Sequence, residues 1–329
     1  MRSEEMKSLK ENILRKARLS IIGSMLSMAT ISPLALHAQG SPIYITPLFE
    51  YPVAPEELPD LQSKSEYILT HFWDNMDFGS KSTVDQNALN HAFEIYTAAM
   101  PYSSAEVAMG SVNTLIKKLK GNPTLTLQFT KAAEETLYGP RAEFWSDDIY
   151  GAFLKNVISD KDIAPIRKAR YERQQKILNA TAVGKKFPQL RLTLRDGRQR
   201  EFKADKEWTL IEIGNPDCDD CRFAKTKLSM ASDLQDLVEE GKLEILFIVA
   251  DAVPEEQADL LNDFASYPDY WTPSISYGAD DILDIRYTPS FYLLGKKGEI
   301  LGKNMDVNAA IDKLRESVSE SKAKGKAKK

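Results

Sequence analysis

Cysteine and histidine are scarce in this chain: among 329 residues there are two cysteines, Cys218 and Cys221, and three histidines. A closed zinc site requires four Cys, His or carboxylate ligands, and no histidine lies near the cysteines in the sequence. The sequence therefore predicts no metal and no cofactor.

Basic charge is also scarce in the body of the chain. Beyond residue 38 there are 37 lysines and arginines against 45 aspartates and glutamates, and five of those lysines fall in the last eight residues. A protein that binds nucleic acid needs a basic surface to replace counterions, so we expect no nucleic-acid partner. The overall composition, 43% hydrophobic and 28% charged, is that of a globular protein, and the length favours two domains.

The N-terminus has the order of a secretory signal. Residues 1–18 hold six lysines and arginines, residues 19–36 are mostly apolar, and a small residue, Ala38, follows. We predict a signal peptide over residues 1–38 and export to the periplasm. The alternative is an uncleaved anchor in the inner membrane, which the serines, the glycine and the proline of the apolar stretch disfavour. The stretch has no cysteine, which excludes a lipoprotein anchor.

Residues 39–180 show a helical pattern and predict an all-α domain. Apolar side chains recur at helical spacing, for example in one stripe made by Ile149, Tyr150, Phe153, Leu154 and Val157. Further helices are expected over residues 124–138 and 164–179.

The period changes near residue 183 and predicts an α/β domain over residues 181–320. Strands are expected near 190–194, 208–213, 243–250, 290–295 and 299–302, with helices over 254–266 and 308–319. Residues 321–329 are rich in lysine, and we expect them to be a disordered tail.

The two cysteines fall where the predicted strand 208–213 gives way to a helix. The N-terminus of a helix favours a thiolate at Cys218, and a thiolate is the nucleophile of disulfide exchange. Cys221 lies one turn further on, where it could resolve a mixed disulfide. The alternative is an inert structural disulfide, but a two-residue gap closes a ring too small to restrain the unfolded chain much.

At this point the sequence resembles the thioredoxin superfamily. The Cys-x-x-Cys pair is followed by Tyr287-Thr288-Pro289-Ser290-Phe291, which resembles the cis-proline segment of that family, and Glu212 stands six residues before Cys218, at the place of the family's buried carboxylate. Over residues 183–319 the layout is similar to exported TlpA/ResA-type proteins. Residues 41–180, with His71-Phe72-Trp73-Asp74-Asn75, resemble the uncharacterised helical domain that precedes such domains in exported Bacteroidota proteins.

The resemblance implies a thioredoxin-like fold, a central mixed β-sheet flanked by helices, and a thiol–disulfide oxidoreductase. Cys218 and Cys221 would form the redox-active disulfide, and Glu212 would accept a proton unless it points to the solvent face of its strand. Thr288 and Pro289 would bind the substrate backbone, although Pro289 could also be an ordinary trans turn proline. The implied partners are disulfide-containing protein substrates and a membrane thiol–disulfide electron donor.

The sequence departs from the thioredoxin pattern around the first cysteine. Asp217 replaces the usual tryptophan, and Asp219 and Asp220 occupy the two positions between the cysteines. Three carboxylates oppose a thiolate at Cys218, which stabilises the disulfide and favours a reductant or isomerase over an oxidase. The alternative is that Asp219 and Asp220 only complement the dipole of the helix that begins there.

Two other functions remain open. A peroxiredoxin resembles Pro-x-x-x-Thr-x-x-Cys, and here Ile211 and Asn215 stand at the proline and threonine positions, which argues against it. The second is a binding or scaffold protein of the cell envelope, in which the thioredoxin-like domain is redox-inactive. Replacing Cys218 by serine would separate these functions, because only thiol exchange needs that sulfur.

Overall fold

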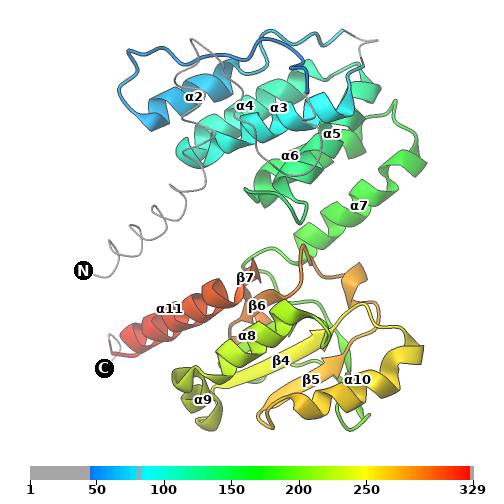
Figure 1. Ribbon diagram of the computed structural model, residues 1–329, viewed down its shortest axis with the longest axis vertical. Helices are drawn as coiled ribbons and strands as arrows, with labels where there is room; N and C mark the ends of the chain where they lie inside the picture. The colour runs from blue at the N-terminus through cyan, green and yellow to red at the C-terminus, as the bar shows by residue number, and fades with distance from the viewer. Residues whose placement is uncertain (1–44, 80–82, 327–329) are drawn as a thin grey trace, which may run out of the picture. The chain divides into compact units, whose positions relative to one another are not determined.

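The computed structural model describes residues 45–79 and 83–326 (Figure 1), and the predicted signal peptide lies outside these residues. The chain forms two compact units that divide between Ile163 and Ala164. No helix of residues 45–79 or 83–326 has the length and apolar character needed to cross a membrane.

The first unit is helical, as the sequence predicts. It contains α2 (Leu61–His71), α3 (Gln86–Ala98), the 3₁₀ turn η1 (Met100–Tyr102), α4 (Ala105–Lys118), α5 (Pro123–Leu137) and α6 (Asp147–Ser159). Each of the five α-helices begins at an Asp, Ser or Asn whose side chain accepts a backbone N–H of the first turn. The core is aromatic: the ring of Phe129 lies 5.1 Å from that of Trp73 and 5.6 Å from that of Phe93.

The second unit contains α7 (Pro165–Ala180) and a sheet of seven strands. The strands are β1 (Arg191–Leu194), β2 (Gln199–Glu201), β3 (Trp208–Ile213), β4 (Leu243–Val249), β5 (Trp271–Ile275), β6 (Ser290–Leu294) and β7 (Ile300–Met305). Their order is β2-β1-β5-β4-β3-β6-β7. β3, β4 and β5 run parallel, and the other pairs are antiparallel. This is the mixed sheet that the sequence predicts.

One face of the sheet is covered by α8 (Asp219–Ser229), α9 (Ser232–Glu239), α10 (Gln257–Asp263) and α11 (Val307–Lys326), all four labelled in Figure 1. Leu210 of β3 and Phe247 of β4 pack there against Leu228 of α8 and Leu314 of α11. Short 3₁₀ turns complete the unit: η2 (Pro254–Glu256), η3 (Phe264–Ser266), η4 (Ala279–Asp281) and η5 (Lys296–Gly298). The opposite face buries Ile211 and Ile213 in a second cluster.

β5 is a strand that the sequence analysis did not predict, and Pro273 lies in its middle. A proline cannot donate to a sheet ladder. Here β1 pairs only with Ser274 and Ile275, beyond the proline, while β4 pairs with the whole of β5. Pro273 is tolerated because the missing N–H falls where β1 does not reach.

The structure bears on two of the predicted boundaries. α7, expected in the helical domain, is grouped with the second unit, where its Arg173 pairs with Asp281. The expected disordered tail from residue 321 is wrong as far as Lys326, because α11 continues to that residue. Lysine and alanine favour a helix, and Ser321 is held by a 2.8 Å hydrogen bond to Glu207.

Candidate redox-active site

The two segments that carry the predicted site residues meet at one edge of the sheet. β3 ends at Ile213, which lies opposite Ser290, the first residue of the antiparallel strand β6. The loop after β3 leads to Cys218, and the loop before β6 carries Thr288 and Pro289. The antiparallel register therefore brings both loops to the same edge, although about 70 residues separate them in sequence.

Cys218 is the N-cap residue of α8, and its side chain is half-buried. Its Sγ accepts the backbone N–H of Cys221 at 3.2 Å. Cys221, one turn further on, is buried, with 1% of its surface exposed. Both cysteines are free thiols in the structure, so the Cys218–Cys221 disulfide stays a prediction. One sulfur is thus accessible to a partner, and the other lies directly behind it.

Burial raises the pKa of the Cys221 thiol well above its ordinary value. The hydrogen bond with Cys218 and the nearby carboxyl of Glu212 act in the same direction, and a backbone hydrogen bond from Asn215 opposes them. Cys221 therefore holds its proton in the dithiol form. If Cys221 is to attack a mixed disulfide, another group must take that proton.

Glu212 lies where such a group is needed. It alternates with Trp208 and Leu210 along β3 and so belongs to the face that α8 covers. Its side chain is fully buried, and neither carboxyl oxygen has a hydrogen-bond partner among the described residues. Burial raises the pKa of Glu212 to about 8, against a lowering influence from Lys225. The solvent-facing alternative for Glu212 is therefore wrong, while its role in proton transfer stays a prediction.

Lys225 and Tyr267 are neighbours of this carboxyl that the sequence analysis missed. The Nζ of Lys225 donates to the hydroxyl of Ser266 at 3.1 Å and sits 4.4 Å from the centre of the Tyr267 ring. That ring packs on Phe247, the residue opposite Glu212 in β4. The spacing of four residues between Cys221 and Lys225 on a helix was the available signal; Tyr267 had none.

The three aspartates around Cys218 are all exposed. Asp219 and Asp220 lie in the first turn of α8, and Asp219 forms an ion pair with Arg222. Asp217 lies in the loop before the helix, where its N–H donates to the side chain of Asn215. Charges that face water interact weakly, so the redox-tuning role of these aspartates stays a prediction.

The second loop has the backbone form expected of it. The Thr288–Pro289 peptide bond is cis, Thr288 is exposed and Pro289 is half-buried. Immediately after it, Ser290 is fully buried at the start of β6. The loop thus places the exposed residue Thr288 at the edge of the sheet where Cys218 lies.

Gly214 is a further residue of the site that the sequence analysis did not select. A Cβ atom built at this position would lie 2.9 Å from the Sγ of Cys221 and 3.1 Å from the ring of Phe247. Such distances are shorter than van der Waals contact, so no larger side chain fits without displacing the thiol.

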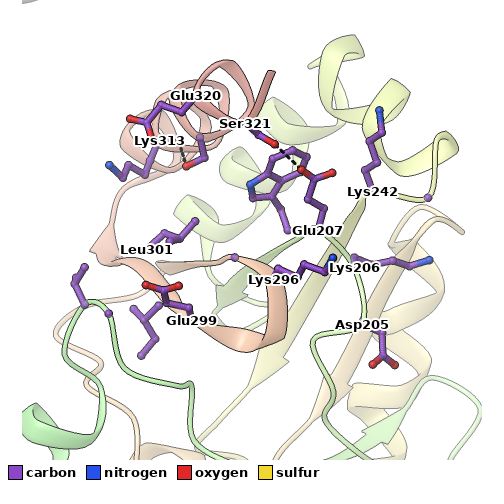
Figure 2. Close-up of a pocket in the computed structure, with 17 residues that line it drawn as sticks. Asp205, Lys206, Glu207, Lys242, Lys296, Glu299, Leu301, Lys313, Glu320 and Ser321 are labelled. Carbon is purple, nitrogen blue, oxygen red and sulfur yellow. Dashed lines mark hydrogen bonds between the residues drawn. The ribbon is translucent and has the colours of Figure 1, made fainter. Parts of the chain in front are cut away.

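A hollow of about 860 Å³ lies away from the cysteines. Its lining includes Glu207 and Lys242, the residues just before β3 and β4 (Figure 2). Cys218, by contrast, follows the end of β3. Over residues 45–79 and 83–326 no group of three or more His, Cys, Asp or Glu side chains could hold a metal ion. The chemistry available at the site is that of the two thiols and the buried carboxyl.

The raised pKa of Glu212 predicts a specific pH dependence of stability. Between its ordinary value of 4.5 and about 8, the folded state keeps a proton on Glu212 that the unfolded state loses. The free energy of unfolding therefore falls as the pH rises, by at most about 1.4 kcal/mol per pH unit. Glu212→Gln removes this dependence, so the variant should gain stability relative to wild type from pH 5 to pH 8 in urea unfolding of the reduced protein. Parallel pH curves for the two proteins would contradict the burial of an uncharged carboxyl.

The close approach at Gly214 predicts that Gly214→Ala destabilises the reduced protein by about 1–3 kcal/mol, because the new methyl group must push Cys221 or Phe247 aside. Urea unfolding measures the change. The control is Gly151→Ala in α6, where an added Cβ meets no atom within 4 Å and the helix should be unaffected or stabilised. Equal stabilities of the two variants would refute the steric argument.

Comparison with known proteins is consistent with this architecture. A thioredoxin-like protein from Bacteroides caccae has the same overall fold, with a TM-score of 0.64 at 21% identity, covering 81% of this chain and 98% of that one. A thiol-disulfide oxidoreductase from Bacteroides fragilis matches at 20% identity over 40% of this chain and 98% of its own, with a TM-score of 0.33. A search of curated proteins gave no match.

The family match concerns the N-terminal part of the chain. Residues 3–180, more than half of the sequence, match a family described as a domain of unknown function, DUF5106, and the match ends with the last residue of α7. The chain therefore belongs to the DUF5106 family, and here that domain precedes a thioredoxin-like domain.

Proposed function

We propose that the protein is a periplasmic thiol–disulfide oxidoreductase that acts as a disulfide reductant or isomerase. The observation that carries the proposal is the pair of thiols at the N-terminus of α8, near the buried carboxyl of Glu212. Cys218 is accessible, and Cys221 is buried. The similarity of the fold to a thioredoxin-like protein agrees with it. Export rests on the order of basic, apolar and small residues at the N-terminus.

In the first step, the thiolate of Cys218 attacks one sulfur of a substrate disulfide. A bond forms between Cys218 and that sulfur, the substrate S–S bond breaks, and the other substrate sulfur leaves as a thiolate that takes up a proton. The backbone of Thr288, an exposed residue beside Pro289, would hold the substrate strand during this step. The product is a mixed disulfide at the accessible sulfur.

In the second step, Glu212 in its ionised form, which is the minor form at neutral pH because its pKa is about 8, takes the proton of Cys221, and the resulting thiolate attacks the Sγ of Cys218. The Cys218–Cys221 disulfide forms and the second substrate sulfur leaves as a thiolate. The substrate has then gained two electrons and the protein has lost two. A carboxyl with a pKa of about 8 suits this exchange, because it can both accept and release a proton near neutral pH.

A further round requires an external reductant. The periplasm oxidises thiols, so a membrane thiol–disulfide donor would have to return two electrons and two protons to the Cys218–Cys221 disulfide. In isomerisation, by contrast, the substrate's own thiol displaces Cys218 and no net reduction occurs.

The two cysteines should give opposite results when replaced separately. Cys221→Ser keeps the accessible thiol and removes the resolving one, so mixed disulfides with a substrate such as reduced-and-reoxidised ribonuclease should accumulate on non-reducing gels. Cys218→Ser should abolish disulfide exchange, with at least a hundredfold loss of rate, because the nucleophile is gone. Unchanged exchange in Cys218→Ser would contradict the assignment of Cys218 as the nucleophile, and no exchange in the wild type would favour the redox-inactive binding protein.

The reduction potential tests the direction of electron flow. Asp217 and Asp220 place negative charge beside Cys218, which opposes its thiolate and favours the disulfide. Equilibration with defined dithiothreitol or glutathione buffers should therefore give a potential near or below about −250 mV. The paired change Asp217→Asn and Asp220→Asn should raise it by about 10–30 mV. A wild-type value of about −120 to −180 mV would contradict a reductant and indicate an oxidase or isomerase.

A further inference from the structure

A buried polar cluster lies behind the loop that carries Thr288 and Pro289. At its centre is Asp284, whose side chain is completely buried and forms ion pairs with two cations. The Nη2 of Arg286 lies 2.9 Å from its Oδ2, and the Nζ of Lys303 lies 2.6 Å from the same oxygen. The cluster therefore joins the loop before β6 to the strand β7.

Asn304, the neighbour of Lys303 in β7, bonds the loop on both sides of the cis peptide bond. Before that bond, its Oδ1 accepts the backbone N–H of Arg286 at 3.3 Å and its Nδ2 donates to Asp284 at 2.9 Å. After it, the same Oδ1 accepts the hydroxyl of Ser290 at 3.1 Å. The backbone oxygen of Asn304 also accepts the hydroxyl of Tyr287 at 3.4 Å. One residue thus holds both ends of the segment.

β7 has a β-bulge where Asn304 bonds the loop. In the register of β6 and β7, Phe291 lies opposite Met305 but Leu293 lies opposite Gly302, so β7 has one extra residue there. Asn304 has a φ of +48°, in the left-handed region. Such bulges redirect side chains and are frequent next to active sites, and asparagine tolerates this backbone conformation better than most residues.

We propose that Asn304 is a positioning residue for substrate binding. It fixes the segment from Asp284 to Ser290 so that the backbone of Thr288 stands ready to pair with an extended peptide beside Cys218. This inference rests on the proposed thiol–disulfide function. It is a separate statement, however, because it concerns how peptide substrates are held and not how sulfur exchanges.

The test compares two substrates that differ in whether they have a peptide backbone. Insulin offers a disulfide within a peptide, whereas 2-hydroxyethyl disulfide offers a disulfide alone. In Asn304→Gly the side-chain bonds are lost while the positive φ is kept, because glycine adopts it freely. The KM for insulin should rise about tenfold, as expected for the loss of buried hydrogen bonds, with little change in kcat. The rate with 2-hydroxyethyl disulfide should change by less than about twofold.

Two further variants test whether a change in KM comes only from a general loss of stability. Ser290→Ala removes one partner of Asn304 and leaves the ion pairs of Asp284, so the KM for insulin should rise by a smaller factor, about two to threefold. Asn262→Gly changes an exposed asparagine at the end of α10 and should leave both substrates unaffected.

Each outcome decides the question. An equal loss of rate with both substrates in Asn304→Gly would show a merely structural role and overturn the inference, as would an unchanged KM for insulin. If the wild-type protein reacts with neither disulfide, the proposed function itself fails, and this inference fails with it. A selective rise in KM for insulin supports both.

Discussion

The burial of one carboxyl in the central strand is the constraint on which the site depends. Glu212 lies between β4 and β6, on the face of the sheet that α8 covers with apolar side chains. An ionised carboxylate without partners is costly in such a place, and the protein avoids the cost by keeping the group protonated at neutral pH and below. The burial of Glu212 therefore has two effects: it keeps a proton on the carboxyl, and it makes the stability of the folded protein depend on pH.

The same burial separates the roles of the two thiols. Cys221 points into the core, where Gly214 leaves just enough room for its sulfur, and both it and Glu212 are held uncharged by the lack of water. Cys218, at the helix end, remains accessible. In the proposed mechanism the proton of Cys221 passes to Glu212, and the substrate reacts at Cys218.

Much of this could be predicted from local patterns. The helices of the first unit follow from capping residues and apolar spacing, and the strand–turn–helix around Cys218 follows from β-rich residues running into a Cys-x-x-Cys pair. β5 could not be predicted from local pattern, since Pro273 is acceptable in this strand only because β1 pairs with the residues beyond the proline. The helix of residues 321–326 depends likewise on an anchor, Ser321 to Glu207, that is distant in sequence.

The candidate site, too, can be predicted only in part from local sequence patterns. The spacing of Cys218, Cys221 and Pro289 is a signal in itself, but the cluster around Asp284 joins two charged residues and an asparagine from separate segments, none of which stands out in the sequence. A buried ion pair is weak evidence for stability, because desolvation of the charges offsets their attraction. Such a cluster is better understood as holding the chain around it in one conformation. Here the geometry that it fixes is that of the loop which, in the proposed mechanism, holds the substrate peptide beside the thiols.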